Sequence, residues 1–316
     1  MKVTEHLDRA TRPVISFEII PPVRGGNLRD LTSLIEDLVK YEPPFIDITS
    51  HAAEAIYEET SDGIKKKIKR KRPGTLGICA LIQNKYNVDA VPHILCHGFT
   101  REETEDVLIE FRYLGIDNVL AVRGDALDYK KTIEGHRTVN RWAGDLVQQI
   151  ADMNRGIYLE DDLLDADASE FCVGVSGYPE KHLEAPNLKT DLDRTKAKID
   201  AGAEYVVTQM FFDNRHFFEY EKRCREIGID VPIIPGLKIL TSKSQLTTIP
   251  GTFHIDIPAD LSDEVMAAKN ESVAEIGLEW TMRQAEELLS RGVPALHFFV
   301  MQNSRAITKL LDRLQP

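Results

Sequence analysis

Eight short apolar runs recur along the chain, and turn residues bound each of them. The runs span residues 14–20, 45–50, 90–96, 118–124, 171–177, 205–211, 232–238 and 295–301. Many of their residues are β-branched or aromatic. A short apolar run between turn residues is typical of a strand that is buried in a parallel sheet. The pattern therefore predicts eight buried strands.

Amphipathic patterns with helical spacing fill most of the gaps between these runs. They span residues 28–41, 100–115, 141–153, 188–202 and 214–228. Several begin with Thr, Asn or Asp and end in Gly, as capped helices do. The segment 74–86 fits a strand or a helix, and we predict a helix because the number of strands then stays at eight. The longest gap, 240–294, is expected to hold an extra loop and a longer helix over 272–292.

The alternation of eight strands with helices predicts an α/β protein with one domain, a (β/α)8 TIM barrel over residues 1–316. The alternative is a doubly wound open sheet. That alternative is weaker because no G-x-G-x-x-G pattern opens any of the predicted helices.

The net charge of −12 narrows the range of partners, because it argues against nucleic acid and against an anionic membrane surface. The basic run 65–72 is the exception, and we interpret it as the solvated end of a helix. The sequence shows neither a leader with an apolar core nor an apolar stretch of membrane-spanning length. Its four cysteines are scattered without C-x-x-C spacing, which indicates reduced thiols. We therefore expect a cytoplasmic protein.

Polar residues gather where the predicted strands end. They are Glu18, Thr49, Ser50, His93, Arg123, Gly124, Asp125, Ser176, Tyr178, Thr208, Gln209, Lys238, Gln302, Asn303 and Arg305. Each one alone has a structural explanation, such as a hydrogen-bonded core histidine or a turn with a local ion pair. The C-terminal ends of barrel strands share one rim, however, and the active sites of such barrels lie there. Taken together, these residues predict a site.

Metal and phosphate-loop sites are not indicated. His93 and Cys96 lie three apart on a predicted strand and so point to opposite faces, which argues against a shared metal ion. The sequence contains no H-E-x-x-H, paired C-x-x-C or P-loop pattern. The segment GVSGY at 174–178 lacks the final glycine of a nucleophile elbow. We expect no metal site.

Seven motifs follow one another over nearly the whole chain. They are SFEIIPP (16–22), PHILC (92–96), AVRGD (121–125), GYPEKHLEA (177–185), DAGAEYVVTQMFFD (200–213), IIPGL (233–237) and LHFF (296–299). This ordered set resembles the methylenetetrahydrofolate reductase family. The resemblance implies a flavoenzyme that passes a hydride from NADH or NADPH to FAD and then to 5,10-methylenetetrahydrofolate, giving 5-methyltetrahydrofolate. We also expect a homo-oligomer and, because the sequence ends soon after the eighth predicted strand, no appended regulatory domain.

The resemblance implies catalytic roles for Glu18 and Asp125. Glu18 matches the general acid that protonates an amine nitrogen of the folate, so that the five-membered ring of the folate opens. The neighbours of Glu18 support this role, because a carboxyl between apolar residues has its charged form disfavoured and stays protonated near neutral pH. Asp125 matches the acid that faces flavin and pterin, where a carboxylate binds the pterin amino groups and tunes the flavin.

The resemblance also implies residues that bind the cofactor and the substrates. For FAD they are Thr49, Ala52, His93, Arg123, Gly124, Asp125, Ala143, Tyr178, His182, Ala185, Asp191 and Lys198. For folate they are Gln209, Gln245 and Arg305, with Asn303 as the alternative to Arg305. Gln209 is also expected to bind the nicotinamide, since an amide both donates and accepts hydrogen bonds.

Two alternatives stay open at this point. The eighth predicted strand departs from the family pattern, because Phe299 stands where a tyrosine is usual. One alternative is a non-catalytic barrel subunit of a larger reductase that binds FAD or folate. The other is a flavin-free barrel enzyme, such as a lyase that uses Glu18 and Lys238.

Overall fold

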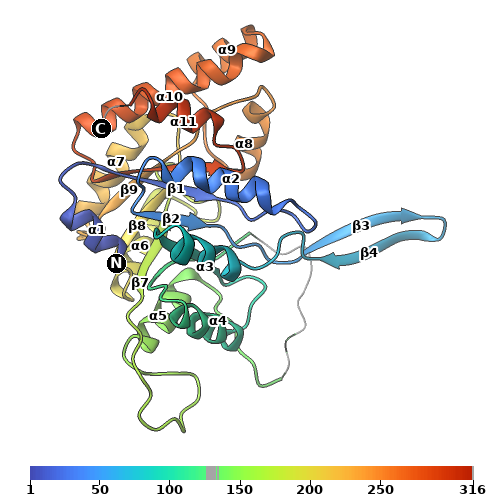
Figure 1. Ribbon diagram of the computed structural model, residues 1–316, viewed down its shortest axis with the longest axis vertical. Helices are drawn as coiled ribbons and strands as arrows, with labels where there is room; N and C mark the ends of the chain where they lie inside the picture. Colours follow the sequence, from blue (N-terminus) through green and yellow to red (C-terminus); the bar gives the residue numbers. More distant parts are fainter. Residues whose placement is uncertain (126–132, 134, 315–316) are drawn as a thin grey trace.

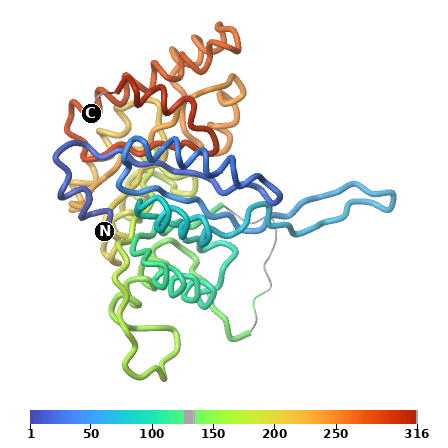
Figure 2. The backbone as a smooth tube through the Cα atoms, in the orientation of Figure 1, coloured from blue at the N-terminus to red at the C-terminus, as the bar shows by residue number. Residues whose placement is uncertain are grey.

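Eight parallel strands close into a barrel in the computed structural model, which describes residues 1–125, 133 and 135–314. Around the barrel the strands follow the order β1, β10, β9, β8, β7, β6, β5, β2. Each of the eight apolar runs overlaps one of these strands, so the predicted (β/α)8 fold is confirmed. Figure 1 shows the helices packed around the barrel, and Figure 2 traces the chain in the same orientation.

The barrel strands are short, and most of their residues are buried. Their bounds are β1 (Val14–Ile19), β2 (Phe45–Ile48), β5 (Asp89–Leu95), β6 (Asn118–Val122), β7 (Cys172–Gly177), β8 (Tyr205–Met210), β9 (Ile233–Leu237) and β10 (Ala295–Met301). All residues of β1 and β2 are buried. Helices cover the outer face of the barrel and side chains fill its interior, so both faces of each strand need apolar residues. This explains why the runs show little alternation with polar residues.

Helices lie between the strands and beyond both ends of the barrel sequence. Their bounds are α1 (Val3–Arg9), α2 (Leu28–Val39), α3 (Leu76–Lys85), α4 (Arg101–Tyr113), α5 (Ala143–Met153), α6 (Leu188–Asp200), α7 (Asn214–Glu226), α8 (Gln245–Phe253), α9 (Ala259–Ala267), α10 (Val273–Ser290) and α11 (Arg305–Leu311), with a 3-10 helix at Asn270–Ser272. The segment 74–86 is a helix, as predicted. The long gap after β9 holds α8 and α9 before α10, where the sequence suggested only a loop.

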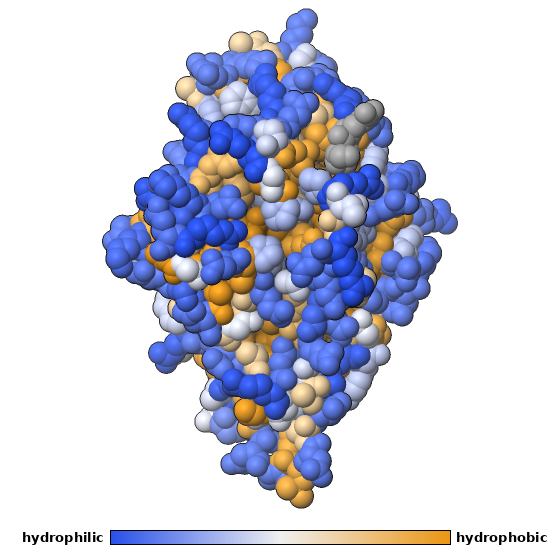
Figure 3. Space-filling view, turned by 90° about the vertical axis from the view of Figure 1, so that its left-hand side faces the viewer, coloured by the Kyte–Doolittle hydropathy of each residue, from blue (hydrophilic) through white to orange (hydrophobic). Residues whose placement is uncertain are grey.

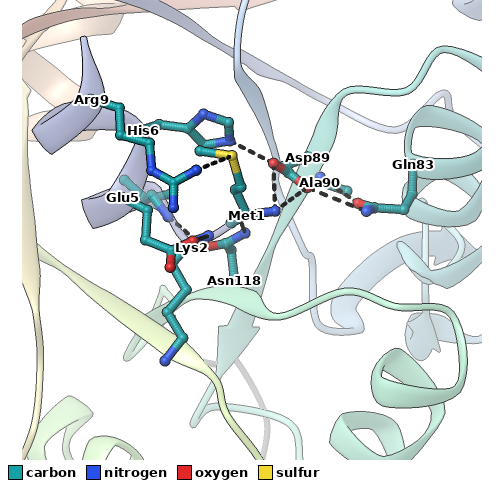
Figure 4. A network of polar contacts seen from close by, with 10 residues as sticks. Met1, Lys2, Glu5, His6, Arg9, Gln83, Asp89, Ala90 and Asn118 are labelled. Atoms are coloured by element: carbon teal, nitrogen blue, oxygen red, sulfur yellow. Dashed lines mark hydrogen bonds and ion pairs between the residues drawn. The ribbon is translucent and has the colours of Figure 1, made fainter.

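Helix α1 closes the N-terminal end of the barrel. Val3 is fully buried, and its backbone N–H donates to the Asn118 side chain at 2.8 Å. The same side chain donates to the Met1 carbonyl oxygen at 2.8 Å. Figure 4 shows this network, in which His6 Nε2 lies 2.5 Å from Asp89 Oδ2. The barrel interior is therefore capped at this end, and a site is expected at the other end.

Strands β3 (Glu54–Thr60) and β4 (Gly63–Lys69) form an antiparallel hairpin that projects far from the barrel (Figure 1). The interpretation of residues 65–72 as a helix end is therefore wrong, since most of this basic run lies in β4. Acidic residues of β3 stabilise the pairing: Lys67 Nζ lies 2.6 Å from a Glu58 carboxylate oxygen. The basic run alone does not reveal this partner strand.

Gly277 allows α10 to pack closely against the chain that follows β9. A Cβ atom at this position would lie 1.9 Å from the carbonyl oxygen of Leu240. We expect Gly277→Ala to lower the free energy of unfolding by about 2 kcal/mol, because packed backbone must move apart. The matched control is Gly251→Ala on α8, where a Cβ atom would meet nothing within 4 Å. Urea unfolding followed by circular dichroism measures both changes, and equal destabilisation by the two would contradict this packing.

Candidate active site

The C-terminal ends of the barrel strands surround a cavity of about 390 Å³, called the central cavity below. Residues from β1, β5, β6, β7, β8 and β10 line it, together with the segment that follows β2. The cavity therefore lies at the end of the barrel opposite α1, where the predicted polar strand-end residues converge.

A row of buried ionisable groups lies beneath the central cavity. Glu18 lines the cavity and is 8% exposed, and His93 Nε2 lies 3.6 Å from its Oε2 atom. His93 Nε2 also lies 3.5 Å from Oδ1 of Asp47, which is 1% exposed. On the other side of Asp47, Oδ2 lies 3.9 Å from His297 Nδ1, which contacts Ser16 Oγ at 2.9 Å. Two carboxyl groups and two imidazoles thus alternate inside the barrel.

Burial shifts the pKa values of the ionisable groups in this row. It raises the pKa of Glu18 to about 7, although His93 and Lys238 favour the charged carboxylate. Burial opposes the charged form of His93 as well, but Asp47 and Glu18 hold the pKa of His93 above its ordinary value. Burial lowers the pKa of His297. Near neutral pH, Glu18 is therefore able to give up a proton, and its neighbour His93, whose charged form the two carboxyl groups favour, lies in position to stabilise the carboxylate.

Irregular strand pairing occurs where two side chains enter the central cavity. The register of β1 on β10 shifts between Glu18 and Ile19, and the register of β8 on β9 shifts between Val207 and Met210. Such irregularities locally break the ladder and re-aim side chains. Gln209 lies within the second one and lines the cavity, and its Oε1 atom accepts a hydrogen bond from Met210 N at 2.9 Å.

The turn after β6 forms another part of the cavity wall. Gly124 has a φ of +82°, in the left-handed region that favours glycine, and a Cβ atom there would lie 3.4 Å from Leu95. The next residue, Asp125, is exposed at the cavity mouth. Its carbonyl oxygen lies 2.7 Å from His97 Nδ1. The glycine thus sets the path of the turn that carries Asp125.

A second cavity of about 500 Å³, the side cavity, adjoins the central cavity, and Arg123 lines both. Arg123 forms a two-point ion pair with Glu184, in which one nitrogen–oxygen distance is 2.6 Å. Its guanidinium also lies 5.1 Å from the ring centre of Trp142, and the Arg194 guanidinium lies 5.8 Å from the same ring. Trp142 is 51% exposed, so its ring offers a stacking surface at this cavity.

Lys198 is a half-buried cation of the side cavity. Burial lowers its pKa to about 8, an effect that the carboxylate of Asp191 opposes. Lys198 Nζ donates to the Ser176 carbonyl oxygen at 2.5 Å. Asp191 in turn accepts a hydrogen bond from the backbone N–H of His182 at 2.9 Å. A cation held in this way suits an anionic group such as a phosphate.

A third cavity of about 630 Å³, the outer cavity, adjoins the central cavity on the other side, and Phe299 lines both. Gln245 and Arg305 line it too, but the Gln245 amide oxygen already accepts from Thr241 N at 2.6 Å and so holds the loop before α8. Lys238 also borders this cavity. Burial lowers the pKa of Lys238 to about 8, and its ammonium donates to the Phe299 carbonyl oxygen at 2.8 Å.

The structure brings nearly all the predicted site residues to these adjoining cavities. The central cavity is lined by Glu18, Thr49, Ala52, His93, Arg123, Gly124, Asp125, Tyr178, His182 and Gln209. The side cavity adds Ala143, Asp191 and Lys198, and the outer cavity adds Gln245 and Arg305. Ala185 is buried and lines none of the three. These positions agree with one elongated site, while the individual roles stay predictions.

The residues around the cavities fit a dinucleotide such as FAD. Thr49 Oγ1 and His51 Nδ1 border the central cavity, are buried, and have no hydrogen-bond partner among the described residues. Such atoms are costly unless a ligand satisfies them. Arg123 and Lys198 supply cations for phosphates, and Trp142 supplies an aromatic face for a planar ring.

Sequence reasoning missed four residues at the site. Asp47 and His297 are polar residues inside otherwise apolar runs, which is the signal that identified Glu18, so they could have been found in the same way. Trp142 and Glu184 lie outside the strand runs, and only the folded chain brings them to Arg123.

Comparison with known proteins places the chain in a family. The sequence model described as "Methylenetetrahydrofolate reductase" matches residues 2–315. The chain belongs to this family. The resemblance that the seven motifs suggested is thereby confirmed.

Individual relatives differ in length from this chain. Methylenetetrahydrofolate reductase (NADH) 1 of Arabidopsis thaliana is 30% identical over 99% of this chain and 51% of its own length. Methylenetetrahydrofolate reductase 1 of Schizosaccharomyces pombe is 28% identical over 99% of this chain and 48% of its own length. The chain therefore spans about half the length of these relatives. For the 5,10-methylenetetrahydrofolate reductase of Pectobacterium carotovorum, the identity is 27% over 92% of this chain and 86% of the relative.

Solved structures share the fold at low sequence identity. A protein from Clostridium thermocellum that binds two copies of 5-methyl-5,6,7,8-tetrahydrofolic acid superposes with a TM-score of 0.58, at 12% identity over 97% of this chain and 96% of that one. Oxaloacetate acetylhydrolase superposes with a TM-score of 0.52, at 10% identity over 99% of this chain and 82% of that one. These similarities show the barrel fold. Within the part of the chain that the structure describes, every helix is too short or too polar to cross a membrane.

The contacts within the buried row predict that the pKa of His93 depends on Asp47. Asp47→Asn removes a negative charge that favours the imidazolium, so we expect the pKa of His93 to fall. NMR titration of protein labelled with ¹⁵N-histidine measures the change. The control is Asp89→Asn, which removes the carboxylate beside His6 at the opposite end of the barrel and should leave His93 unchanged. A His93 titration that is the same in Asp47→Asn and in the unmodified protein would contradict the coupling.

Proposed function

We propose that the chain reduces 5,10-methylenetetrahydrofolate to 5-methyltetrahydrofolate, with electrons from NADH or NADPH and with FAD as cofactor. Membership in the methylenetetrahydrofolate reductase family supports the reaction. The observation that carries the proposal is Glu18, a buried carboxyl with a pKa raised to about 7 that lines the central cavity. A proton donor of this kind is what ring opening at a weakly basic amine requires. The bound methyltetrahydrofolate of the Clostridium thermocellum protein supports folate as a ligand of this fold.

Residues of the central and side cavities would hold FAD. Arg123 and Lys198 would bind the pyrophosphate, and Trp142 would stack on the adenine. Arg123 has five N–H donors, so it is able to keep its ion pair with Glu184 and bind a phosphate oxygen as well. When bound, FAD supplies a two-electron carrier between the nicotinamide and the folate.

Glu18 would act first on the folate, by giving its proton to the ring amine nitrogen so that the five-membered ring opens. Burial keeps the proton on Glu18 near neutral pH until this acceptor arrives. The carboxylate that remains would be stabilised by His93 at 3.6 Å, whose charged form Asp47 favours. Lys238 also favours the charged form of Glu18. The buried row would thus lower the barrier to proton transfer without exposing Glu18 to water.

The rim and the outer cavity would position the substrates. Asp125 at the exposed mouth would accept hydrogen bonds from the pterin amino groups. Gln209 would bind pterin and nicotinamide in turn, since its amide donates and accepts. Gln245 and Arg305 would hold the benzoyl-glutamate part of the folate in the outer cavity, where Arg305 offers a cation for a carboxylate.

Two relatives of this chain are named for different nicotinamide dinucleotides. The one from Arabidopsis thaliana is named for NADH and the one from Caenorhabditis elegans for NADPH. Anaerobic reduction of the FAD-loaded protein with each dinucleotide determines which one this chain uses. Neither the flavin-free lyase nor the non-catalytic subunit would show this reduction together with turnover of the folate.

The variant Glu18→Gln distinguishes proton transfer to the folate from reduction of FAD by the nicotinamide. We expect folate reduction to slow by about 10²–10⁴-fold, the usual contribution of a general acid. Reduction of bound FAD by the preferred nicotinamide should stay within about threefold of the unmodified rate, because that step needs no proton from Glu18. Stopped-flow measurement of the two half-reactions tests both expectations.

The control for this variant is Glu180→Gln, which changes a half-buried glutamate whose pKa burial also raises but which lies outside the three cavities. It should leave both half-reactions unchanged. In the unmodified protein, the folate half-reaction should slow as the pH rises through about 7, because Glu18 then loses its proton. Wild-type folate turnover in Glu18→Gln would refute the role of Glu18.

A further inference from the structure

The hairpin β3–β4 carries a face on which three large apolar side chains are exposed. Residues directly opposite in an antiparallel pair lie on the same face, so the pairs Ala55–Ile68, Tyr57–Lys66 and Glu59–Ile64 share one face, where the Lys66 ammonium lies 5.5 Å from the centre of the Tyr57 ring. Tyr57 is 58% exposed, Ile64 is 72% exposed and Ile68 is 50% exposed. We call this set of Ala55, Tyr57, Ile64 and Ile68 the apolar face.

The opposite face of the hairpin is mainly charged. It carries the pairs Glu54–Lys69, Ile56–Lys67 and Glu58–Lys65. The hairpin is therefore amphipathic in the same way as a strand pair that covers a core. An isolated two-stranded hairpin is marginally stable in water, and a row of exposed apolar side chains marks an interaction site. The hairpin stands away from the barrel (Figure 1), so among the described residues the barrel does not cover its tip, and a surface of another molecule is able to reach it.

The charge of the hairpin indicates which kind of molecule it binds. Residues 54–72, which we call the arm, hold seven Lys or Arg and four Asp or Glu, so the arm is positive in a chain of net charge −12. Lys65 and Lys69 have no ion-pair partner among the described residues. A second copy of the same acidic chain is attracted to such an arm.

The loop of residues 157–167 is complementary to the arm. Its charge is opposite to that of the arm, and it too exposes apolar side chains. It holds five Asp or Glu and no Lys or Arg. Leu164 is 91% exposed and Leu163 is 48% exposed. The loop lies at the lower end of Figure 1, well apart from the arm, and the lower end of Figure 3 shows hydrophobic surface beside hydrophilic surface there. The arm and the loop of one molecule therefore do not meet.

We propose that the arm of one copy docks on the 157–167 loop of a second copy. The apolar face would pack on Leu163 and Leu164, while the arm lysines would lie against Asp161 and Asp162. Every molecule has one arm and one loop, so a pair of copies related by a twofold axis would form the contact twice.

Docking would also affect the candidate active site, because the arm begins at the wall of the central cavity. Ala52, Ala53 and Glu54, at the start of β3 and just before it, line the central cavity. At the other end of the arm, the Arg72 side chain donates to the Pro21 carbonyl oxygen next to β1. A partner that fixes the arm therefore fixes part of the wall of the central cavity. This proposal concerns assembly and stands or falls independently of the proposed reaction.

Sedimentation velocity on a dilution series of the full chain tests the contact. We expect the protein to self-associate, and Ile64→Thr with Ile68→Thr to weaken association by about tenfold or more, because two apolar side chains lose burial. The matched control is Ile56→Thr, on the charged face of the same hairpin, which should leave association unchanged. Lys65→Glu with Lys69→Glu should also weaken it, and mixing that variant with Asp161→Lys plus Asp162→Lys should restore association between the two.

Disulfide trapping identifies the contact directly. The four native cysteines are buried, so cysteines introduced on the surface are the ones that oxidise. A mixture of Ile64→Cys and Leu164→Cys proteins should give a cross-linked pair, whereas a mixture of Ile56→Cys and Leu164→Cys should give at least tenfold less. A monomeric unmodified protein, association that is insensitive to the Ile64 and Ile68 changes, or an arm that binds RNA in preference to a second copy would each overturn the proposal.

Discussion

The site depends on the interaction between a carboxyl group enclosed by the barrel, Glu18, and the imidazole of His93 at 3.6 Å. The closed sheet places Glu18 and Asp47 side by side on neighbouring strands, and α1 closes the far end against water. Two carboxylates in such a setting cannot both be charged cheaply. The result is a pKa of Glu18 that burial raises and a pKa of His93 that Asp47 and Glu18 raise against the effect of burial. The proton chemistry that we propose follows from this constraint.

The cavities that adjoin this row differ in character, and the difference suits them to different parts of one reaction. The side cavity combines half-buried Lys198 with the half-exposed ring of Trp142, a combination that suits phosphates and a planar ring. The outer cavity carries Arg305 near the surface. Glu18 lies at the central cavity that adjoins both. A cofactor and a folate that enter from opposite sides would therefore meet above the proton donor.

The barrel fold and much of the candidate site could be predicted from the sequence, because the barrel strands are buried on both faces and therefore appear as continuous apolar runs. The same property exposed Glu18 as an exception inside a run. The β3–β4 hairpin escaped prediction because its stability comes from pairing with an acidic strand, and its basic half fits a solvated helix end equally well. Trp142 and Glu184 escaped for a related reason, since neighbours distant in sequence bring them to Arg123. Local patterns identify buried elements; they do not identify contacts between loops.

In the proposed mechanism Glu18 keeps its proton near neutral pH, and infrared difference spectroscopy detects that proton on the carboxyl group itself. Spectra of the unmodified protein minus Glu18→Gln, recorded over a pH series, isolate the carbonyl stretch of the protonated carboxyl. The account predicts that this band persists from acidic pH and disappears only as the pH passes about 7. A band that disappears near the ordinary glutamate pKa of about 4.3 would contradict it.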